Sequence, residues 1–119
     1  MRRRQWLRRF QHMVTTDRSG SPREVLRKHR SAILALLDER GVRDVRVYGS
    51  LARGEEDVES DIDLLVELPD TVSAGVELLT ALGLAEELSQ LVRARVDVAT
   101  PRTLRDEVRD AALAEAIPL

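Results

Sequence analysis

The sequence contains no cysteine, and this absence removes several kinds of chemistry at once. Disulfide bonds, thiolate zinc sites and a cysteine nucleophile all require this residue, so the chain can use none of them. Only 3% of the 119 residues are aromatic, which argues against the base-stacking surfaces of single-strand nucleic-acid binders. No apolar run approaches the roughly 18 residues that span a bilayer, and no apolar signal segment follows the basic start. We therefore expect a cytoplasmic protein that makes no membrane contact.

Charge is distributed unevenly along the chain. The formal net charge is -2, but residues 1–30 carry +8 and residues 31–119 carry -10. We interpret residues 1–20 as a basic, poorly ordered extension and residues 21–119 as a single domain. The alternative for the extension is a basic amphipathic helix that binds a partner, a nucleic acid or a membrane surface. Nucleic-acid binding is expected only through this extension.

Hydrophobic periodicity predicts an α/β (α+β) fold in which helices pack a small mixed β-sheet, in the order α-β-β-α-β-α. Ser21 and Glu24 form a capping box that starts the first helix, and Gly41 ends it. The three helices are expected over residues 22–40, over residues 72–93 and after a cap at Thr103. The three strands are expected over residues 43–48, 62–68 and 95–99.

Each of the first two helices has one apolar stripe that we expect to face the core. The stripe of the first helix consists of Val25, Leu26, Ile33, Leu36 and Leu37. The stripe of the second helix consists of Leu78, Leu82, Ala85, Leu88 and Val92.

Three aspartates are expected to converge on one face of the sheet. Strand alternation places Asp61 and Asp63 on the same face, roughly 7 Å apart at their Cα atoms. A strand–helix–strand connection favours parallel pairing of the second and third strands, which would bring Asp97 beside both. Clustered carboxylates repel one another, and their oxygens suit Mg²⁺ or Mn²⁺. Asp-x-Asp alone could equally be a solvated strand face, but Asp97 favours two divalent cations acting on a phosphate.

A Gly-Ser turn directly follows the first strand and is a candidate phosphate-binding segment. Gly49 would allow a close approach of the backbone, and the Ser50 hydroxyl and nearby amides could hold phosphate oxygens. Arg53 could neutralise phosphate charge or could pair with Glu55 or Glu56. Ser60 could reach a phosphate oxygen or could satisfy the backbone where the second strand begins.

Taken together, these residues resemble a known family. Gly49-Ser50, a spacer, Asp61-x-Asp63 and the later Val96-Asp97-Val98 are similar to the motifs of the polymerase-β-like nucleotidyltransferase superfamily. Within it the chain is most similar to the minimal nucleotidyltransferases (MNT), with the resemblance covering residues 22–118. It implies the palm-like nucleotidyltransferase fold, two Mg²⁺ ions per site, and ATP as substrate.

The resemblance also implies a role for each motif residue. Asp61 and Asp63 would coordinate both metal ions, and Asp97 would ligate the metal ion nearest the acceptor and help to deprotonate its hydroxyl. Gly49 and Ser50 would hold the β- and γ-phosphates, with Arg53 and Ser60 assisting.

Family members of this size are commonly antitoxins of HEPN/MNT toxin–antitoxin modules. The resemblance thus implies an enzyme that transfers AMP from ATP to a tyrosine hydroxyl of a HEPN-domain toxin. The chain also has no length for an acceptor-binding domain, which agrees with a protein acceptor. Two alternatives are an antitoxin that neutralises its toxin by binding alone, and nucleotidyl transfer to a small molecule such as an antibiotic.

Overall fold

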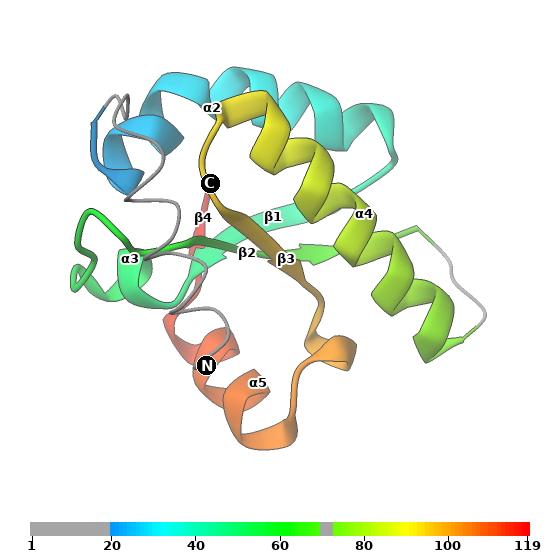
Figure 1. Cartoon of the computed structure of the whole chain (residues 1–119). Helices are drawn as coiled ribbons and strands as arrows, with labels where there is room; N and C mark the ends of the chain where they lie inside the picture. The colour runs from blue at the N-terminus through cyan, green and yellow to red at the C-terminus, as the bar shows by residue number, and fades with distance from the viewer. Residues whose placement is uncertain (1–19, 70–72) are drawn as a thin grey trace.

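The computed structural model describes residues 20–69 and 73–119 (Figure 1). The predicted extension at residues 1–20 lies outside the described residues except for Gly20, so its order and partners stay predictions. The elements, in chain order, are α2 (Pro22–Glu39), β1 (Arg43–Tyr48), α3 (Ser50–Arg53), β2 (Ile62–Glu67), α4 (Ala74–Val92), β3 (Val96–Ala99), the 3₁₀ turn η1 (Pro101–Thr103), α5 (Asp106–Glu115) and β4 (Ile117–Pro118).

The first helix begins and ends as its sequence predicts. The Ser21 side chain accepts a hydrogen bond from the Glu24 amide, and the Glu24 carboxylate accepts one from the Ser21 amide. Pro22 occupies the first helical turn, where its missing N–H is no loss. Gly41 follows the C-cap with φ +75°, a conformation that glycine adopts without strain.

The four strands form one mixed sheet in the order β3-β2-β1-β4. Strands β1 and β2 are antiparallel, whereas β2 and β3 are parallel, as the strand–helix–strand connection predicts. Helices α2 and α4 lie over one face of the sheet and α5 lies under the other (Figure 1).

Strand alternation divides the buried residues between the two faces. Ile62, Leu64 and Val66 of β2 belong to the main core with α2 and α4. Leu65, together with Ala99 and Ala112, belongs to a smaller cluster between the sheet and α5. The smaller cluster leaves room on its face for the polar residues at the start of β2 and β3.

The predicted stripe of α4 is wrong in its first half. Leu78 and Leu82 are 47% and 55% exposed, and the buried face consists of Glu77, Ala81, Leu84, Leu88 and Val92. Apolar residues occupy most of this helix's circumference, so periodicity alone does not select a face. Burial of Glu77 is possible because Thr100 and Arg102 both donate hydrogen bonds to its carboxylate.

The cap predicted at Thr103 is also wrong. Pro101 starts the turn η1, whose cap is Thr100, and the Thr103 hydroxyl bonds back to the backbone of Thr100. Helix α5 begins only at Asp106, with Asp106 and Glu107 in its first turn. The α-β-β-α-β-α order therefore gains α3, η1 and β4, each too short to carry a periodic pattern. Among the described residues, the helices are too short or too polar to cross a bilayer.

Candidate active site

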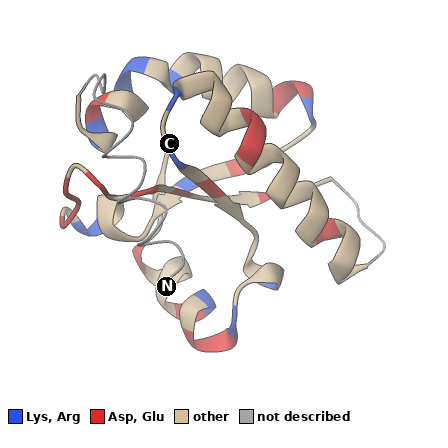
Figure 2. Ribbon diagram, in the orientation of Figure 1, with Lys and Arg blue, Asp and Glu red and all other residues tan. Residues whose placement is uncertain are grey.

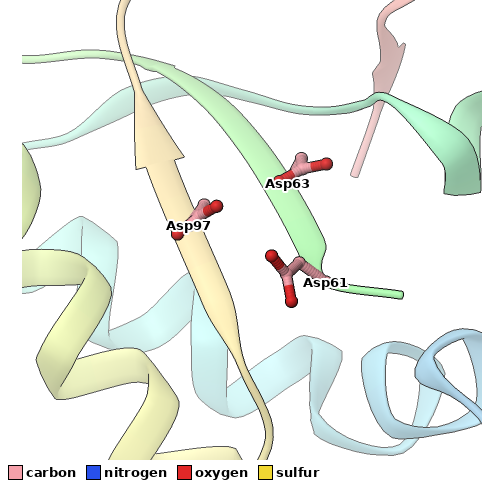
Figure 3. Close-up of side chains that lie close together, drawn as sticks. All are labelled: Asp61, Asp63 and Asp97. Carbon is pink, nitrogen blue, oxygen red and sulfur yellow. The ribbon is translucent and has the colours of Figure 1, made fainter. Parts of the chain in front are cut away.

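The three aspartates converge as the strand pattern predicts. Asp63 on β2 and Asp97 on β3 are direct neighbours in the parallel register. Each of Asp61, Asp63 and Asp97 offers one carboxylate oxygen, and these oxygens lie within 4.8 Å of one another (Figure 3). Asp61 is buried and the other two are half-buried, so the cluster opens toward solvent on one side.

One arginine contacts this cluster in a way that the sequence analysis missed. The Nε atom of Arg95 lies 3.7 Å from Oδ1 of Asp61, and the Asp61 side chain is only 3% exposed. Arg95 precedes Asp97 by two residues, so strand alternation was the signal that could have placed it on this face. Its charge offsets part of the repulsion among the carboxylates.

The Gly49-Ser50 turn lies directly over Asp63. Gly49 has φ +77°, and a Cβ atom at this position would lie 2.5 Å from Oδ2 of Asp63. Only glycine fits both the backbone conformation and the space. The short helix α3 starts at the half-buried Ser50, whose hydroxyl makes no hydrogen bond with the described residues. Binding of a phosphate oxygen by this hydroxyl stays a prediction.

Arg53 has carboxylate partners on two of its nitrogens. Nε donates to Glu55 at 2.9 Å, and Nη1 donates to both oxygens of Glu115 at 3.1 Å. These hydrogen bonds, first to Glu55 and then to Glu115, raise the pKa of the Arg53 guanidinium. The predicted alternative pairing with Glu55 is thus present, whereas Glu56 pairs with Arg23 instead.

Ser60 makes hydrogen bonds within the turn that leads into β2. Its hydroxyl accepts a hydrogen bond from the Asp57 amide at 2.9 Å and lies 3.3 Å from Oδ1 of Asp57. This arrangement matches the alternative in which Ser60 satisfies the backbone at the strand entrance. A phosphate contact by Ser60 stays a prediction.

Glu115 is the second residue that the sequence analysis missed. It accepts a hydrogen bond from the Gly49 amide at 2.8 Å, although 66 residues separate the two in the chain. A carboxylate at the last position of a helix faces the negative end of the helix dipole. This unfavourable position at the end of a predicted helix was the signal in the sequence that could have indicated a distant partner for Glu115.

A small mixed sheet with three converging aspartates beside a glycine-serine turn defines an enzyme domain for nucleotidyl transfer. The chain also matches the family model described as nucleotidyltransferase domain over residues 26–119. The protein therefore belongs to the nucleotidyltransferase-domain family and is a nucleotidyltransferase. The family and fold implied by the motif resemblance are confirmed.

Individual relatives agree with this assignment. The chain is 35% identical over 77 residues to protein adenylyltransferase MntA of Thermococcus cleftensis, covering 65% of this chain and 74% of that protein. A solved structure of a candidate minimal nucleotidyltransferase matches with a TM-score of 0.68 and 40% identity, covering 86% of this chain and 100% of the other. A solved toxin–antitoxin complex with AMP-PNP has the same fold, with a TM-score of 0.59 and 22% identity over 72% of this chain and 68% of its own.

Proposed function

We propose that the protein is an antitoxin that transfers AMP from ATP to a tyrosine hydroxyl of a partner HEPN-domain toxin, in a reaction that needs divalent metal ions. The observation that carries the proposal is the convergence of Asp61, Asp63 and Asp97 beside the Gly49-Ser50 turn. This constellation supplies the two requirements of nucleotidyl transfer, which are a metal-binding cluster and a turn that approaches phosphates closely.

The aspartates fit Mg²⁺, with Mn²⁺ as a possible substitute. All three donors are hard carboxylate oxygens, and they lie close enough together to share ions. Asp61 and Asp63 would hold two ions, and Asp97 would hold the ion nearest the acceptor. Bound divalent cations neutralise charge on the triphosphate and make the attacking hydroxyl more acidic.

The protein's own residues would orient the two reactants. The Ser50 hydroxyl would bind a phosphate oxygen, and Gly49 would let the triphosphate lie close to Asp63. Strand β3 is at the edge of the sheet, so within residues 20–69 and 73–119 no further strand pairs with it on the outer side of Asp97. An acceptor hydroxyl could approach from that side and attack the α-phosphorus. Its oxygen forms the new bond to phosphorus, pyrophosphate leaves, and the hydroxyl proton passes to Asp97.

Two comparisons support a protein acceptor in a toxin–antitoxin pair. The relative from Thermococcus cleftensis is named as a protein adenylyltransferase. The solved complex with AMP-PNP is a toxin–antitoxin pair in which a chain of this fold takes part. A nucleotide-bound complex of that kind agrees with ATP as the donor substrate.

The test is the mass of the toxin after the reaction. The protein, ATP, Mg²⁺ and the candidate HEPN toxin are incubated together, and the mass of the intact toxin is measured by mass spectrometry. We expect a gain of one or more AMP units, which is lost with Asp61→Asn plus Asp63→Asn and with tyrosine-to-phenylalanine toxin variants.

Neutralisation of the toxin in cells distinguishes an antitoxin that acts as an enzyme from one that acts by binding alone. Neutralisation of the toxin in cells should fail with the double aspartate variant. An unmodified toxin that this variant still neutralises would contradict the enzymatic proposal and would support neutralisation by binding alone.

A further inference from the structure

The last helix contacts the catalytic turn through a single side chain. Glu115 is the final residue of α5, and its Oε2 atom accepts a hydrogen bond from the Gly49 amide at 2.8 Å. Both of its oxygens also accept from Nη1 of Arg53 at 3.1 Å. Glu115 therefore binds the first residue of the turn and the last residue of the short helix α3 at the same time.

The place of Glu115 in the helix makes these bonds necessary. A carboxylate at a helix C-terminus is disfavoured by the helix dipole and has no helical amide to bind. The Glu115 side chain is only 21% exposed, so water solvates it incompletely. The Gly49 amide and the Arg53 guanidinium compensate for both effects, and they fix the carboxylate in one position.

Gly49 lies between this carboxylate and the metal-binding cluster. On one side its amide is held by Glu115, and on the other its Cα packs so closely on Asp63 that a Cβ atom would lie 2.5 Å from Oδ2. Movement of the Gly49 amide therefore changes the position of the turn relative to Asp63. The Ser50 hydroxyl would move with it, because Ser50 is the next residue.

We propose that Glu115 is a positioning residue for nucleotidyl transfer, acting through the Gly49 amide to hold the Gly49-Ser50 turn at its working distance from Asp63. This inference rests on the proposed function. Arg53 supports Glu115 by donating from Nη1 to both oxygens of the carboxylate. With Nε and Nη1 both bonded to glutamates, the first task of Arg53 is to hold Glu115 rather than to bind phosphate.

Two substitutions separate the amide bond from the charge. Glu115→Gln keeps an oxygen that can accept from the Gly49 amide but loses the charge that pairs with Arg53. Glu115→Ala loses both. Glu107→Ala is the matched control, because Glu107 is an exposed glutamate of the same helix with no contact to the turn.

The readouts are AMP transfer to the toxin, binding of AMP-PNP with Mg²⁺ by calorimetry, and hydrogen exchange of the Gly49 amide. We expect Glu115→Ala to lower kcat on the order of 10–100-fold, to raise KM for ATP and to speed exchange at Gly49. Glu115→Gln should recover most of kcat, and Glu107→Ala should match the wild-type chain. A thermal melt of each variant checks that it is folded.

Several results would overturn the role of Glu115. If Glu115→Ala has the kcat and KM of the wild-type chain, Glu115 has no positioning role. If Glu115→Ala has a lower KM for ATP, the carboxylate competes with phosphate instead of positioning the turn. Equal defects in the alanine and glutamine variants would assign the effect to the charge instead of the amide bond. Failure of the proposed function differs from all of these, because the wild-type chain itself would neither transfer AMP nor bind AMP-PNP.

Discussion

At the scale of single residues, Gly49 is the position where backbone geometry and site chemistry depend on each other most closely. Its backbone conformation, with φ +77° and ψ -150°, disfavours any side chain by about 1–3 kcal/mol. Its Cα also packs against Asp63, so a methyl group would displace either the turn or the carboxylate. A substitution at this glycine should therefore lower the free energy of unfolding through the backbone strain, and lower AMP transfer through the displacement of the turn or of Asp63.

We predict that Gly49→Ala lowers the free energy of unfolding by about 1–3 kcal/mol and lowers AMP transfer by at least about 100-fold. The transfer loss follows from displacement of Asp63 and of the turn. Gly54→Ala is the matched control, because Gly54 has φ +71° but a Cβ atom there would meet nothing within 4 Å. Gly54→Ala should lose less stability than Gly49→Ala, because Gly54 has the αL conformation (ψ 25°) and open space around it, and it should keep its activity. Equal activity in the two variants, measured beside urea unfolding, would contradict this account of Gly49.

Glu56 gives a prediction about pH. The hydrogen bond from Arg23 lowers the pKa of the Glu56 carboxyl below its ordinary value of 4.5. A carboxyl whose pKa is lower in the folded state contributes stability at pH values above its unfolded pKa, and this contribution disappears as the pH falls through the folded pKa. The pair connects α2 to the loop that precedes β2.

Glu56→Gln should therefore melt at a lower temperature than the wild-type chain at pH 7, and the difference should shrink as the pH falls below about 4. Thermal melts across this pH range measure the effect. Glu86→Gln is the control, since Glu86 is exposed and makes no ion pair with the described residues. A gap between Glu56→Gln and wild type that is the same at pH 3 and pH 7 would argue against the Arg23 pairing.

At the scale of elements, the buried face of α4 differs from the apolar stripe that the sequence predicts for this helix. Leu88 is fully buried, whereas Leu79 is 70% exposed, although both are leucines in the same helix. Glu77 lies on the buried side because Thr100 and Arg102 satisfy its carboxylate. Packing against β3 and the η1 turn that follows it thus determines the orientation of the helix.

We predict that Leu88→Ala lowers the free energy of unfolding by about 2–5 kcal/mol, because it leaves a cavity in the core. Leu79→Ala should change it by less than about 0.5 kcal/mol, as exposed positions usually do. Urea unfolding of both variants gives the comparison. Similar losses at the two positions would mean that α4 presents a different face to the sheet.

The helix α4 also shows where sequence reasoning stops. Asp61, Asp63 and Asp97 could be placed because strand alternation and a parallel crossover fix the direction of every side chain on those strands. No comparable constraint exists for α4, where several faces are apolar. Glu115 could not be placed on Gly49 because that hydrogen bond joins residues 66 positions apart, and only the packing of α5 under the sheet brings them together.

At the scale of the whole molecule, the sheet separates a packing face from a reactive face. Helices α2 and α4 close the main core, while α5 lies on the other face (Figure 1), where Asp61 is buried and Asp63 and Asp97 are half-buried. Acidic residues also lie along the loop between α3 and β2, close to the start of that strand (Figure 2). Residues 31–119 carry a formal charge of -10. A triphosphate that approaches this face without cations is repelled by it.

This charge arrangement leads to the central claim, which is that the three aspartates hold divalent metal ions and, through them, a nucleoside triphosphate. Calorimetric titration of AMP-PNP into the protein, with Mg²⁺ and again with EDTA, tests the claim most directly. We predict saturable binding with Mg²⁺, little or none with EDTA, and loss of the Mg²⁺-dependent binding in Asp63→Asn. Equal affinity in Mg²⁺ and EDTA, or unchanged binding in Asp63→Asn, would contradict it.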